Sequence, residues 1–309
     1  MNNSIYLVGN TGFVGSNLMQ CEDFTMSAHS LDVTKMYGHR PDVLVYAGVT
    51  GTKWLANQNP AQDMKVIEQT IINIVKIKPK KIVLISTVDV YDELVGSNED
   101  STINEECLHT YGRNRYHLEK WVRGNCEDYH IVRIPALYGL NIKKNFVFDL
   151  INLIPAMMKE EQFNHVEKHI SCIANFYSRN NEGIYVLNSE INRSELIRLR
   201  KEFAVIEENS LIFTNSNSKY QFYNLQWLWT DILNTINQNI SVRNIVTEPV
   251  NAGEVYEYIN GHKWCNENPK IINYNIQTLY GKKYLIDKSK VLEDLKRFCM
   301  NQIFIKYGE

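Results

Sequence analysis

The stretch that decides the fold lies near the start of the chain, where residues 5–15 read Ile-Tyr-Leu-Val-Gly-Asn-Thr-Gly-Phe-Val-Gly. An apolar run typical of a buried strand is followed by glycines at positions 9, 12 and 15 and then by a helix-like segment. Gly9 allows a tight turn, Gly12 lets backbone N–H groups approach a pyrophosphate, and Gly15 lets the helix pack closely. The pattern predicts a dinucleotide-binding loop that places the positive end of a helix at the phosphates.

Three spaced glycines also occur in purely structural turns, so their surroundings decide between the two interpretations. Here the preceding strand is apolar, and the following segment places apolar residues near one helical face: Phe13, Val14, Leu18 and Met19. This context favours nucleotide binding.

Composition and charge exclude several classes of protein. The chain has 309 residues, enough for one large domain or two joined lobes. Its 33 basic and 35 acidic residues nearly balance, so we expect neither nucleic acid nor a membrane as partner. The six cysteines are scattered and indicate reduced thiols, and no segment is typical of a membrane span or an export signal. We expect a cytoplasmic protein.

Apolar runs typical of buried parallel strands recur along the first half of the chain, at 42–47, 81–86 and 129–134. Helical patterns at 61–77 and 110–122 lie between them. This alternation predicts an α/β fold, a Rossmann-like doubly wound parallel sheet with ligands at the carboxyl ends of its strands.

A smaller, mixed lobe is expected in the second half, where the pattern becomes less regular between Leu140 and Lys219. From Tyr220 the chain is regular again, and a candidate strand at 242–246 is expected to return to the sheet. We therefore predict a dinucleotide-binding domain of residues 1–139 and 220–260 and a substrate-binding lobe of residues 140–219 and 261–309.

Two further segments carry candidate chemistry. Ser86 and Thr87 place two hydroxyls at the carboxyl end of a predicted central strand, where they would face the cofactor crevice. Some twenty residues later, Tyr111-Gly-Arg-Asn-Arg-Tyr-His-Leu-Glu-Lys begins a predicted helix.

With the glycine loop, these segments resemble the extended short-chain dehydrogenase/reductase superfamily of nucleotide-sugar epimerases, dehydratases and reductases. In that superfamily a Ser/Thr before a Val-Tyr pair is catalytic, which selects Thr87 here. The catalytic Tyr-x-x-x-Lys falls on Tyr111, so Arg115 takes the place of the expected lysine. Residues 31–34 resemble the adenine-side segment, and residues 133–139 resemble the Arg-x-Pro-x-x-Tyr-Gly stretch beside the nicotinamide.

The resemblance implies NAD or NADP as cofactor and a nucleotide sugar as substrate. The cofactor contacts that it implies are Gly9, Thr11, Gly12, Phe13, Val14, Gly15, Asp32, Val33, Ala47, Gly48, Ser86, Tyr111, Arg115 and Pro135. The catalytic residues would be Thr87, Tyr111 and Arg115, the substrate contacts Thr87 and Asn145, and no metal is expected. Because residues 27–30 read Ser-Ala-His-Ser, the acid or arginine that would distinguish NAD from NADP is not evident, and the choice stays open.

The expected chemistry explains the residue types. Hydride transfer at a carbinol or carbonyl carbon requires a proton at the oxygen, and a phenol with a pKa near 10 serves best when a nearby cation lowers that pKa. Arg115 keeps the charge of a lysine but is planar and is not deprotonated. If it fills the role of the lysine, Arg115→Lys is expected to preserve or raise the rate, whereas total loss would reveal a specific partner.

Two alternatives concern the same helix. A second register, Tyr116-x-x-x-Lys120, is possible, although about 140° of rotation separates Tyr111 from Tyr116, so both cannot face one crevice. If Tyr116 is not catalytic, we expect it to face solvent or to pack with Trp121. Arg115 could also simply pair with Glu119, one helical turn away.

Two other clusters are expected to be structural. His165 and His169 lie one turn apart without an evident third metal ligand and would form a solvated helix face. A run of aromatic residues is expected to fill a core: Tyr220, Phe222, Tyr223, Trp227 and Trp229.

The reaction is narrowed by the residues after Thr87. The 4,6-dehydratases of the superfamily carry an Asp-Glu pair there, whereas this chain has Val88-Asp89, which disfavours elimination of water. The short N-terminal lobe resembles that of the deoxysugar 4-ketoreductases. We therefore expect an NAD(P)-dependent C4 keto-reductase or dehydrogenase of surface polysaccharide biosynthesis, acting as a homodimer. An epimerase that retains its NAD, or a non-catalytic regulatory protein that binds a dinucleotide, are the alternatives.

Overall fold

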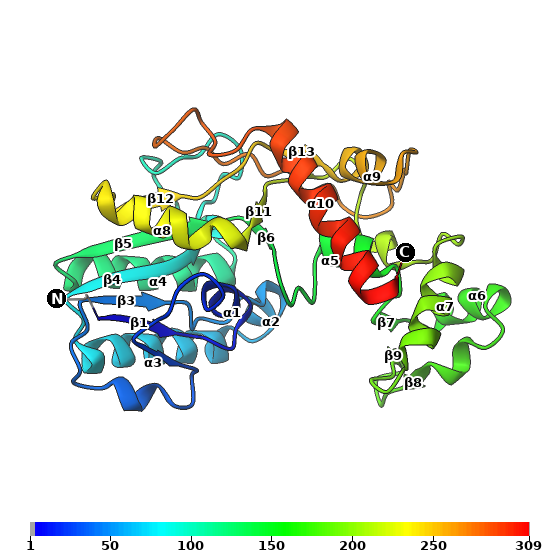
Figure 1. The fold of residues 1–309 in the computed structure, drawn as a ribbon, viewed down its shortest axis with the longest axis horizontal. Coiled ribbons are helices and arrows are strands. Elements are labelled where there is room, and N and C mark those ends of the chain that lie inside the picture. Colours follow the sequence, from blue (N-terminus) through cyan, green and yellow to red (C-terminus); the bar gives the residue numbers. More distant parts are fainter. Residues whose placement is uncertain (1–3, 309) are drawn as a thin grey trace. The chain divides into compact units, whose positions relative to one another are not determined.

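The computed structural model describes residues 4–308 and divides into two compact units. The first unit comprises the described residues through Asn141, together with Gln221–Pro249 and Asn273–Val291. The second unit comprises Ile142–Tyr220, Val250–Ile272 and the chain from Leu292 onward. Figure 1 shows the elements of both units in sequence colours.

A parallel sheet forms the centre of the first unit, in the order β12-β5-β4-β3-β1-β2. Its strands are β1 (Ile5–Val8), β2 (Met26–Ala28), β3 (Val43–Tyr46), β4 (Lys81–Thr87), β5 (Tyr129–Ile134) and β12 (Val242–Asn244). The predicted fold class and the strands expected at 42–47, 81–86 and 129–134 are confirmed, and the segment at 242–246 does return to the sheet. The order reverses at β1, which lies between β2 and β3, so the switch-point crevice is expected where β1 and β3 end.

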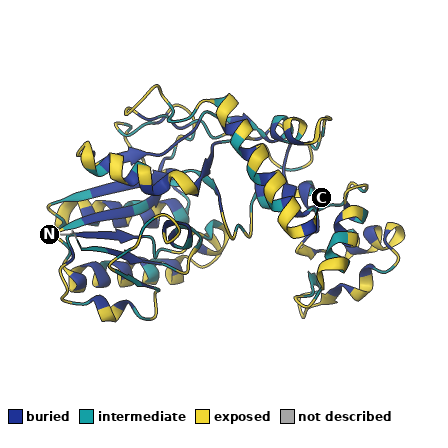
Figure 2. Ribbon diagram, in the orientation of Figure 1, coloured by how far each residue is buried: buried dark blue, intermediate teal, exposed yellow. Residues whose placement is uncertain are grey.

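Helices cover both faces of this sheet. Figure 2 shows that its strands consist mostly of buried residues. On one face, α3 (Pro60–Ile77) and α4 (Thr110–Asn125) bury residues such as Ile67, Ile74 and Leu118. On the other face, α1 (Phe13–Leu18) and α8 (Leu228–Asn237) bury Leu18 and Ile232. The helix α3 begins with Pro60, whose missing N–H costs nothing at a helix start.

Short elements complete the first unit. The helix α2 (Lys53–Gln58) precedes α3, and β6 (Ala136–Tyr138) pairs in parallel with β11 (Phe222–Asn224). The single-turn 3₁₀ helices are η1 (Val33–Met36), η2 (Val88–Val90), η3 (Glu105–Cys107) and η6 (Leu225–Trp227).

The second unit has its own apolar core and a small antiparallel sheet in the order β7-β9-β8. The strands of this sheet are β7 (Met157–Met158), β8 (Tyr177–Arg179) and β9 (Tyr185–Leu187). A separate pair in the second unit is formed by β10 (Lys219–Tyr220) and β13 (Val250–Asn251). The helices of this unit are α5 (Phe146–Asn152), α6 (Glu160–His169), α7 (Arg193–Phe203), η4 (Ile173–Asn175), η5 (Ser210–Phe213) and α9 (Ala252–Asn260). The last helix, α10 (Lys288–Tyr307), starts in the first unit and continues into the second.

The division differs from the predicted one in two segments. Residues 250–260 were expected in the dinucleotide-binding domain, but they belong to the second unit because β13 pairs with β10. Residues 273–291 were expected in the lobe, but they belong to the first unit, where Asn275 bonds to Leu94 and Gly96. Both segments depend on long-range pairing that sequence periodicity does not encode.

Two structural expectations are resolved in detail. The aromatic run packs as expected at Phe222, Tyr223 and Trp229, but Trp227 is 43% exposed because it ends the turn η6 on the surface. Nδ1 of His165 lies against the carboxylate of Glu208. Among residues 4–308, no helix combines the length and apolar character that crossing a bilayer requires.

Candidate active site around Tyr111

Tyr111 and Thr87 lie together at the carboxyl end of β4. Thr87 is the last residue of that strand, and Tyr111 lies in the first turn of α4. The Thr87 hydroxyl lies near enough to the phenol to lower the pKa of Tyr111. The Thr87 hydroxyl also accepts the N–H of Asp89 at 3.1 Å. The structure thus brings together the two residues that the sequence selected as the acid/base and its partner.

Gly112 explains how α4 comes so close to this strand end. A Cβ atom at position 112 would lie 2.0 Å from the carbonyl oxygen of Asp89, so only glycine permits this approach. His109 caps the helix by accepting the N–H of Gly112 at its Nδ1 atom, at 3.1 Å. The Tyr-Gly pair is therefore a packing requirement of the site.

The surroundings of Tyr111 favour the neutral form of its phenol. Burial raises its pKa above the ordinary value of 10.0, and this effect outweighs the lowering of the pKa by Arg115 and by the nearby hydroxyl of Thr87. The carboxylates of Asp89 and Asp63 raise the pKa further. In these surroundings Tyr111 is suited to donate a proton at neutral pH.

Arg115 does not pair with Glu119, the alternative that helical spacing allowed. Its guanidinium carbon lies 3.9 Å from the centroid of the Tyr111 ring, in a cation–π contact. One of its terminal nitrogens, Nη1, forms an ion pair with Asp63, and the other, Nη2, donates to the carbonyl of Thr50 at 2.6 Å. The cation is therefore stacked on the ring of Tyr111.

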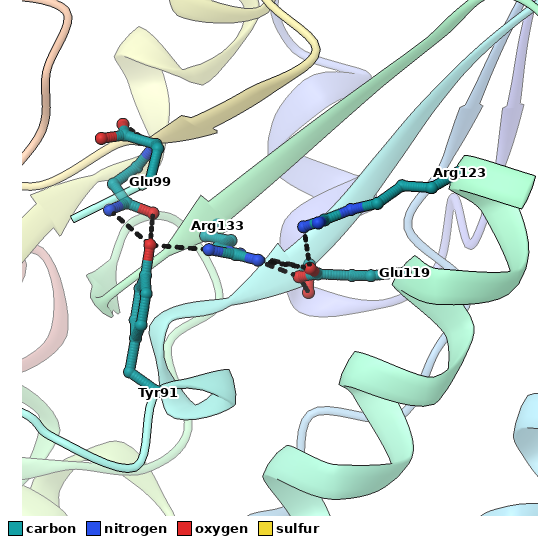
Figure 3. A network of polar contacts seen from close by, with 7 residues as sticks. Tyr91, Glu99, Glu119, Arg123 and Arg133 are labelled. Carbon is teal, nitrogen blue, oxygen red and sulfur yellow. Dashed lines mark hydrogen bonds and ion pairs between the residues drawn. The ribbon is translucent and has the colours of Figure 1, made fainter. Parts of the chain in front are cut away.

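Glu119 belongs to a separate buried network, which Figure 3 shows from close by. Its carboxylate accepts hydrogen bonds from Nε and Nη2 of Arg133, the latter at 2.6 Å. Arg133 in turn donates to the hydroxyl of Tyr91 at 2.6 Å, and Arg123 lies 3.2 Å from Glu119 on its other side. The side chain of Ser86 donates to Glu119 at 2.6 Å, so a cofactor contact by Ser86 would come from its backbone.

The surroundings of the second register on α4, Tyr116-x-x-x-Lys120, do not resemble those of Tyr111. Lys120 is exposed and pairs with Glu105 at 2.6 Å. Tyr116 packs against the apolar cluster that contains Val88 and Val90, whereas Trp121 packs against a different cluster. Of the two tyrosines, only Tyr111 contacts Thr87.

The glycine loop lies against the ends of two strands. Gly9 has φ +98°, and a Cβ there would lie 2.5 Å from the carbonyl oxygen of Ala47, beside Gly48. A Cβ at Gly15 would lie 2.1 Å from the carbonyl oxygen of Gly9, so Gly15 allows α1 to pack on the loop itself. The backbone N–H of Gly9 donates to Ala28 at the end of β2. The loop, Ala47 and Gly48 therefore meet at the switch point of the sheet.

The first turn of α1 is suited to an anion. Its N-cap is Gly12, and no side chain within residues 4–308 caps the helix or adds an acid to its first turn. Thr11 is exposed before this turn, and Phe13 and Val14 are partly buried within it.

The region after β2 holds the predicted adenine-side residues. Val33 is buried in η1. The carboxylate of Asp32 accepts hydrogen bonds from the backbone N–H of His29 at 2.8 Å and from the ammonium of Lys35 at 2.7 Å. The hydrogen bond from Lys35 keeps the pKa of Asp32 low. Asp32 is thus turned toward its own loop.

The two remaining predicted residues lie in different units. Pro135 follows Ile134, which pairs with Thr87 across β5 and β4, so it stands beside the candidate site. Asn145 belongs to the second unit, where its Oδ1 caps α5 by accepting the N–H of Val147 at 2.9 Å. Its side-chain oxygen therefore has a structural task at this helix end.

A cluster that the sequence did not indicate adjoins Thr87. The carboxylate of Asp89 accepts hydrogen bonds from the ammonium of Lys53 and from the hydroxyl of Tyr274, each at 2.7 Å. Nε2 of His109 lies 3.8 Å from the same carboxylate. Burial raises the pKa of Asp89, but these contacts outweigh burial and lower it to about 2. These residues are far apart in sequence. The one signal in the sequence that points to this cluster is the position of Asp89, two residues after Thr87.

Solved structures with the same fold come from several nucleotide-sugar enzymes. The dTDP-4-dehydrorhamnose reductase of Yersinia enterocolitica is 14% identical, with a TM-score of 0.61 over 97% of this chain and 100% of that one. The Bacillus anthracis reductase of the same name, in complex with NADP, is 14% identical with a TM-score of 0.57 over 97% of this chain and 99% of that one. A UDP-N-acetylglucosamine 4-epimerase from Methanobrevibacter ruminantium is 13% identical, with a TM-score of 0.60 over 98% of each chain.

At this level of identity these likenesses establish the fold, and the family follows from the sequence itself. No curated protein matches the chain. The family model described as the RmlD substrate binding domain matches residues 3–170, more than half of the chain. This match confirms the resemblance to the extended short-chain dehydrogenase/reductases. The chain belongs to the RmlD substrate binding domain family.

Proposed function

We propose that this protein is an NAD(P)-dependent oxidoreductase that reduces or oxidises C4 of a nucleotide-linked sugar. The observation that carries the proposal is that Tyr111 and Thr87 meet at the carboxyl end of β4, with the guanidinium of Arg115 over the phenol ring. A partly buried phenol with a neighbouring hydroxyl and cation is an arrangement suited to proton transfer at a sugar oxygen.

The chain has a place for the dinucleotide. Gly9 and Gly15 allow the loop to pack against Ala47 and α1 to pack against the loop, and α1 has backbone N–H groups without a side-chain cap for the pyrophosphate. The nicotinamide, when bound, supplies or accepts the hydride. The Bacillus anthracis structure of the same fold contains NADP, which supports a cofactor of this class here.

The protein's own residues handle the proton. In the direction of reduction, Tyr111 donates its phenolic proton to the carbonyl oxygen of the sugar, and the guanidinium of Arg115 stabilises the phenolate that remains. Thr87 accepts the N–H of Asp89, which fixes its oxygen and leaves its O–H to donate to the phenol or to the substrate oxygen.

Reduction or oxidation is favoured over elimination of water by the residue after Thr87. Val88 is 2% exposed and packs in an apolar cluster, so no acid follows Thr87 directly. The next residue, Asp89, is ionised and held by Lys53 and Tyr274. This arrangement provides no second carboxylic acid to protonate a leaving hydroxyl.

The proposal is tested with the purified protein, NADPH or NADH, and a panel of nucleotide-4-keto sugars. We expect oxidation of the cofactor, followed as loss of its absorbance, with at least one sugar. Oxidation of neither cofactor with any sugar would contradict it. Tightly held NAD, with conversion of one nucleotide sugar into its C4 epimer and no net consumption of cofactor, would instead identify an epimerase.

The remaining parts of the proposal concern the setting. We place the enzyme in the cytoplasm, as a homodimer, in the biosynthesis of a surface polysaccharide. The balanced charge of 33 basic and 35 acidic residues supports a small-molecule substrate in place of nucleic acid. The mass of the protein in solution, measured by light scattering, tests the dimer directly, and a monomer at micromolar concentration would contradict it.

A further inference from the structure

A buried acid is paired with the arginine that replaces the expected lysine. Asp63, on α3, is 7% exposed, and its Oδ2 atom accepts a hydrogen bond from Asn114 at 2.8 Å and forms an ion pair with Arg115. Arg115 is itself only 4% exposed. Both partners lie in the first unit, on neighbouring helices.

The position of Asp63 is unusual for an acid. It lies on the buried side of α3 together with Ile67 and Ile74, whose side chains pack in the core. An ionised carboxylate is rarely buried in a core unless it is paired, because removing the charge from water is costly. Its hydrogen-bond partners therefore account for its presence, and both come from α4.

The contacts of Arg115 fix the plane of its guanidinium. Nη1 is bound by Asp63 and also lies 3.3 Å from the backbone oxygen of Tyr111, while Nη2 donates to Thr50. These anchors lie on three different segments of the first unit, and together they hold the guanidinium carbon over the ring, 3.9 Å from its centroid. The compact ammonium of a lysine cannot bridge the same anchors, because it lacks the planar fork of donors.

We propose that Asp63 is a positioning residue that holds Arg115 against the ring face of Tyr111, so that Asp63 and Arg115 act together where the superfamily uses one lysine. The inference rests on the proposed function for its effect on turnover. It implies that neither residue can be exchanged alone without loss, even when the charge at position 115 is kept.

The direction in which the pKa of Tyr111 moves when Asp63 is replaced shows whether Asp63 positions Arg115 or acts only through its own charge. The charged and titratable groups around Tyr111 are Arg115 on α4, Asp63 on α3, Asp89 on η2, His109 at the start of α4, and Lys53 on α2, which binds Asp89. The Asp63 carboxylate by itself raises the pKa of Tyr111, and Arg115 lowers it. Removing only a negative charge would move the titration of Tyr111 to lower pH, whereas releasing Arg115 from the ring moves it to higher pH.

The test uses the full-length variants Asp63→Asn, Arg115→Lys and the double variant. Steady-state reduction of the sugar identified by the panel gives kcat and KM, and NADPH fluorescence gives the dissociation constant of the cofactor. The ionisation of Tyr111 is followed by tyrosinate absorbance, as the difference between each protein and its Tyr111→Phe counterpart. Glu68→Gln is the matched control, because it removes the same charge from an exposed position of α3.

We expect each single variant to lower kcat at least tenfold with KM within threefold, and the double variant to lose no more than the worse single variant. In Asp63→Asn the titration of Tyr111 shifts to higher pH, and in Glu68→Gln nothing changes. A shift to lower pH, an unchanged kcat, or losses that multiply in the double variant would overturn the proposal.

Two outcomes keep this proposal separate from the proposed function. If the wild-type protein turns over no nucleotide sugar, the proposed function fails, while the direction of the Tyr111 titration in Asp63→Asn still decides the role of Asp63. If Asp63→Asn does not fold, Arg115→Lys retains the buried ion pair and takes its place. An unchanged kcat and an unchanged Tyr111 titration in Arg115→Lys would then overturn the role of the pair.

Discussion

The guanidinium carbon of Arg115 lies 3.9 Å from the centroid of the Tyr111 ring. A cation over the face of a phenol stabilises the phenolate through the ring, whereas an ammonium near the hydroxyl would do so at the oxygen. The pKa of Tyr111 is nevertheless raised, because burial outweighs Arg115. At neutral pH the phenol of Tyr111 is therefore protonated, which is the form that reduction of a carbonyl requires.

The first prediction concerns the identity of the acid. Tyr111→Phe removes the phenolic proton and is expected to lower kcat by about 10²- to 10⁴-fold, the usual contribution of a positioned acid or base. The dissociation constant of NADPH is expected to stay within threefold. Tyr116→Phe is the matched control on the same helix, because Tyr116 packs in an apolar cluster. A large loss in Tyr116→Phe with little effect of Tyr111→Phe would show that the second register is the catalytic one.

The second prediction concerns pH. Reduction needs the protonated phenol, so kcat/KM for reduction is expected to stay level through neutral pH and to fall only above pH 10, since the pKa of Tyr111 is raised above 10.0. Oxidation needs the phenolate, so its rate is expected to rise about tenfold per pH unit below that pKa. Rate profiles in both directions between pH 6 and 10 check this. A limb of the reduction profile near pH 7 that disappears in Tyr111→Phe would contradict it.

The third prediction contrasts a buried and an exposed ion pair. Glu119 is 0% exposed and is bound by Arg133, so Glu119→Gln leaves a buried guanidinium without its counter-charge. We expect a loss of about 3 to 5 kcal/mol in the free energy of unfolding, measured by denaturant titration. Lys120→Gln breaks the exposed pair with Glu105 and is expected to cost less than about 1 kcal/mol. Equal losses in the two variants would argue against the network in Figure 3 as a stabilising feature.

The fourth prediction concerns the glycine loop. Gly15→Ala places a Cβ 2.1 Å from the carbonyl oxygen of Gly9, which must shift the loop, so NADPH affinity is expected to fall at least tenfold. Gly124→Ala, near the end of α4, meets nothing within 4 Å and is expected to stabilise the helix by about 0.5 to 1 kcal/mol without changing affinity. Fluorescence titration and thermal melting measure both effects. Unchanged NADPH affinity in Gly15→Ala would mean that the loop does not hold the cofactor.

Much of the first unit could be predicted from sequence because its signals are local. Apolar strands such as 81–86 and a glycine turn at Gly9 have periodicity or backbone freedom that a single segment reveals. Thr87 and Tyr111 followed from the resemblance to a superfamily, and the structure places them in contact.

The pairing of charges could not be predicted in the same way. Helical spacing predicts Glu119 as the partner of Arg115, but the partner in the structure is Asp63, on another helix. The available signal was an acid in line with the apolar residues Ile67 and Ile74 of α3, which indicates a buried partner without naming it. The segments 250–260 and 273–291 were misplaced for a related reason, since long-range pairing assigns them to their units.

The most direct test of the account is the transfer of deuterium from NADPH labelled at C4 of the nicotinamide to a nucleotide-4-keto sugar. We predict that the wild-type protein forms a reduced sugar that carries one deuterium at C4, detected by mass spectrometry and NMR, and that Tyr111→Phe forms little or none. An unlabelled product, a deuterium at another carbon, or equal labelling by Tyr111→Phe would contradict direct hydride transfer to C4 with Tyr111 as the acid.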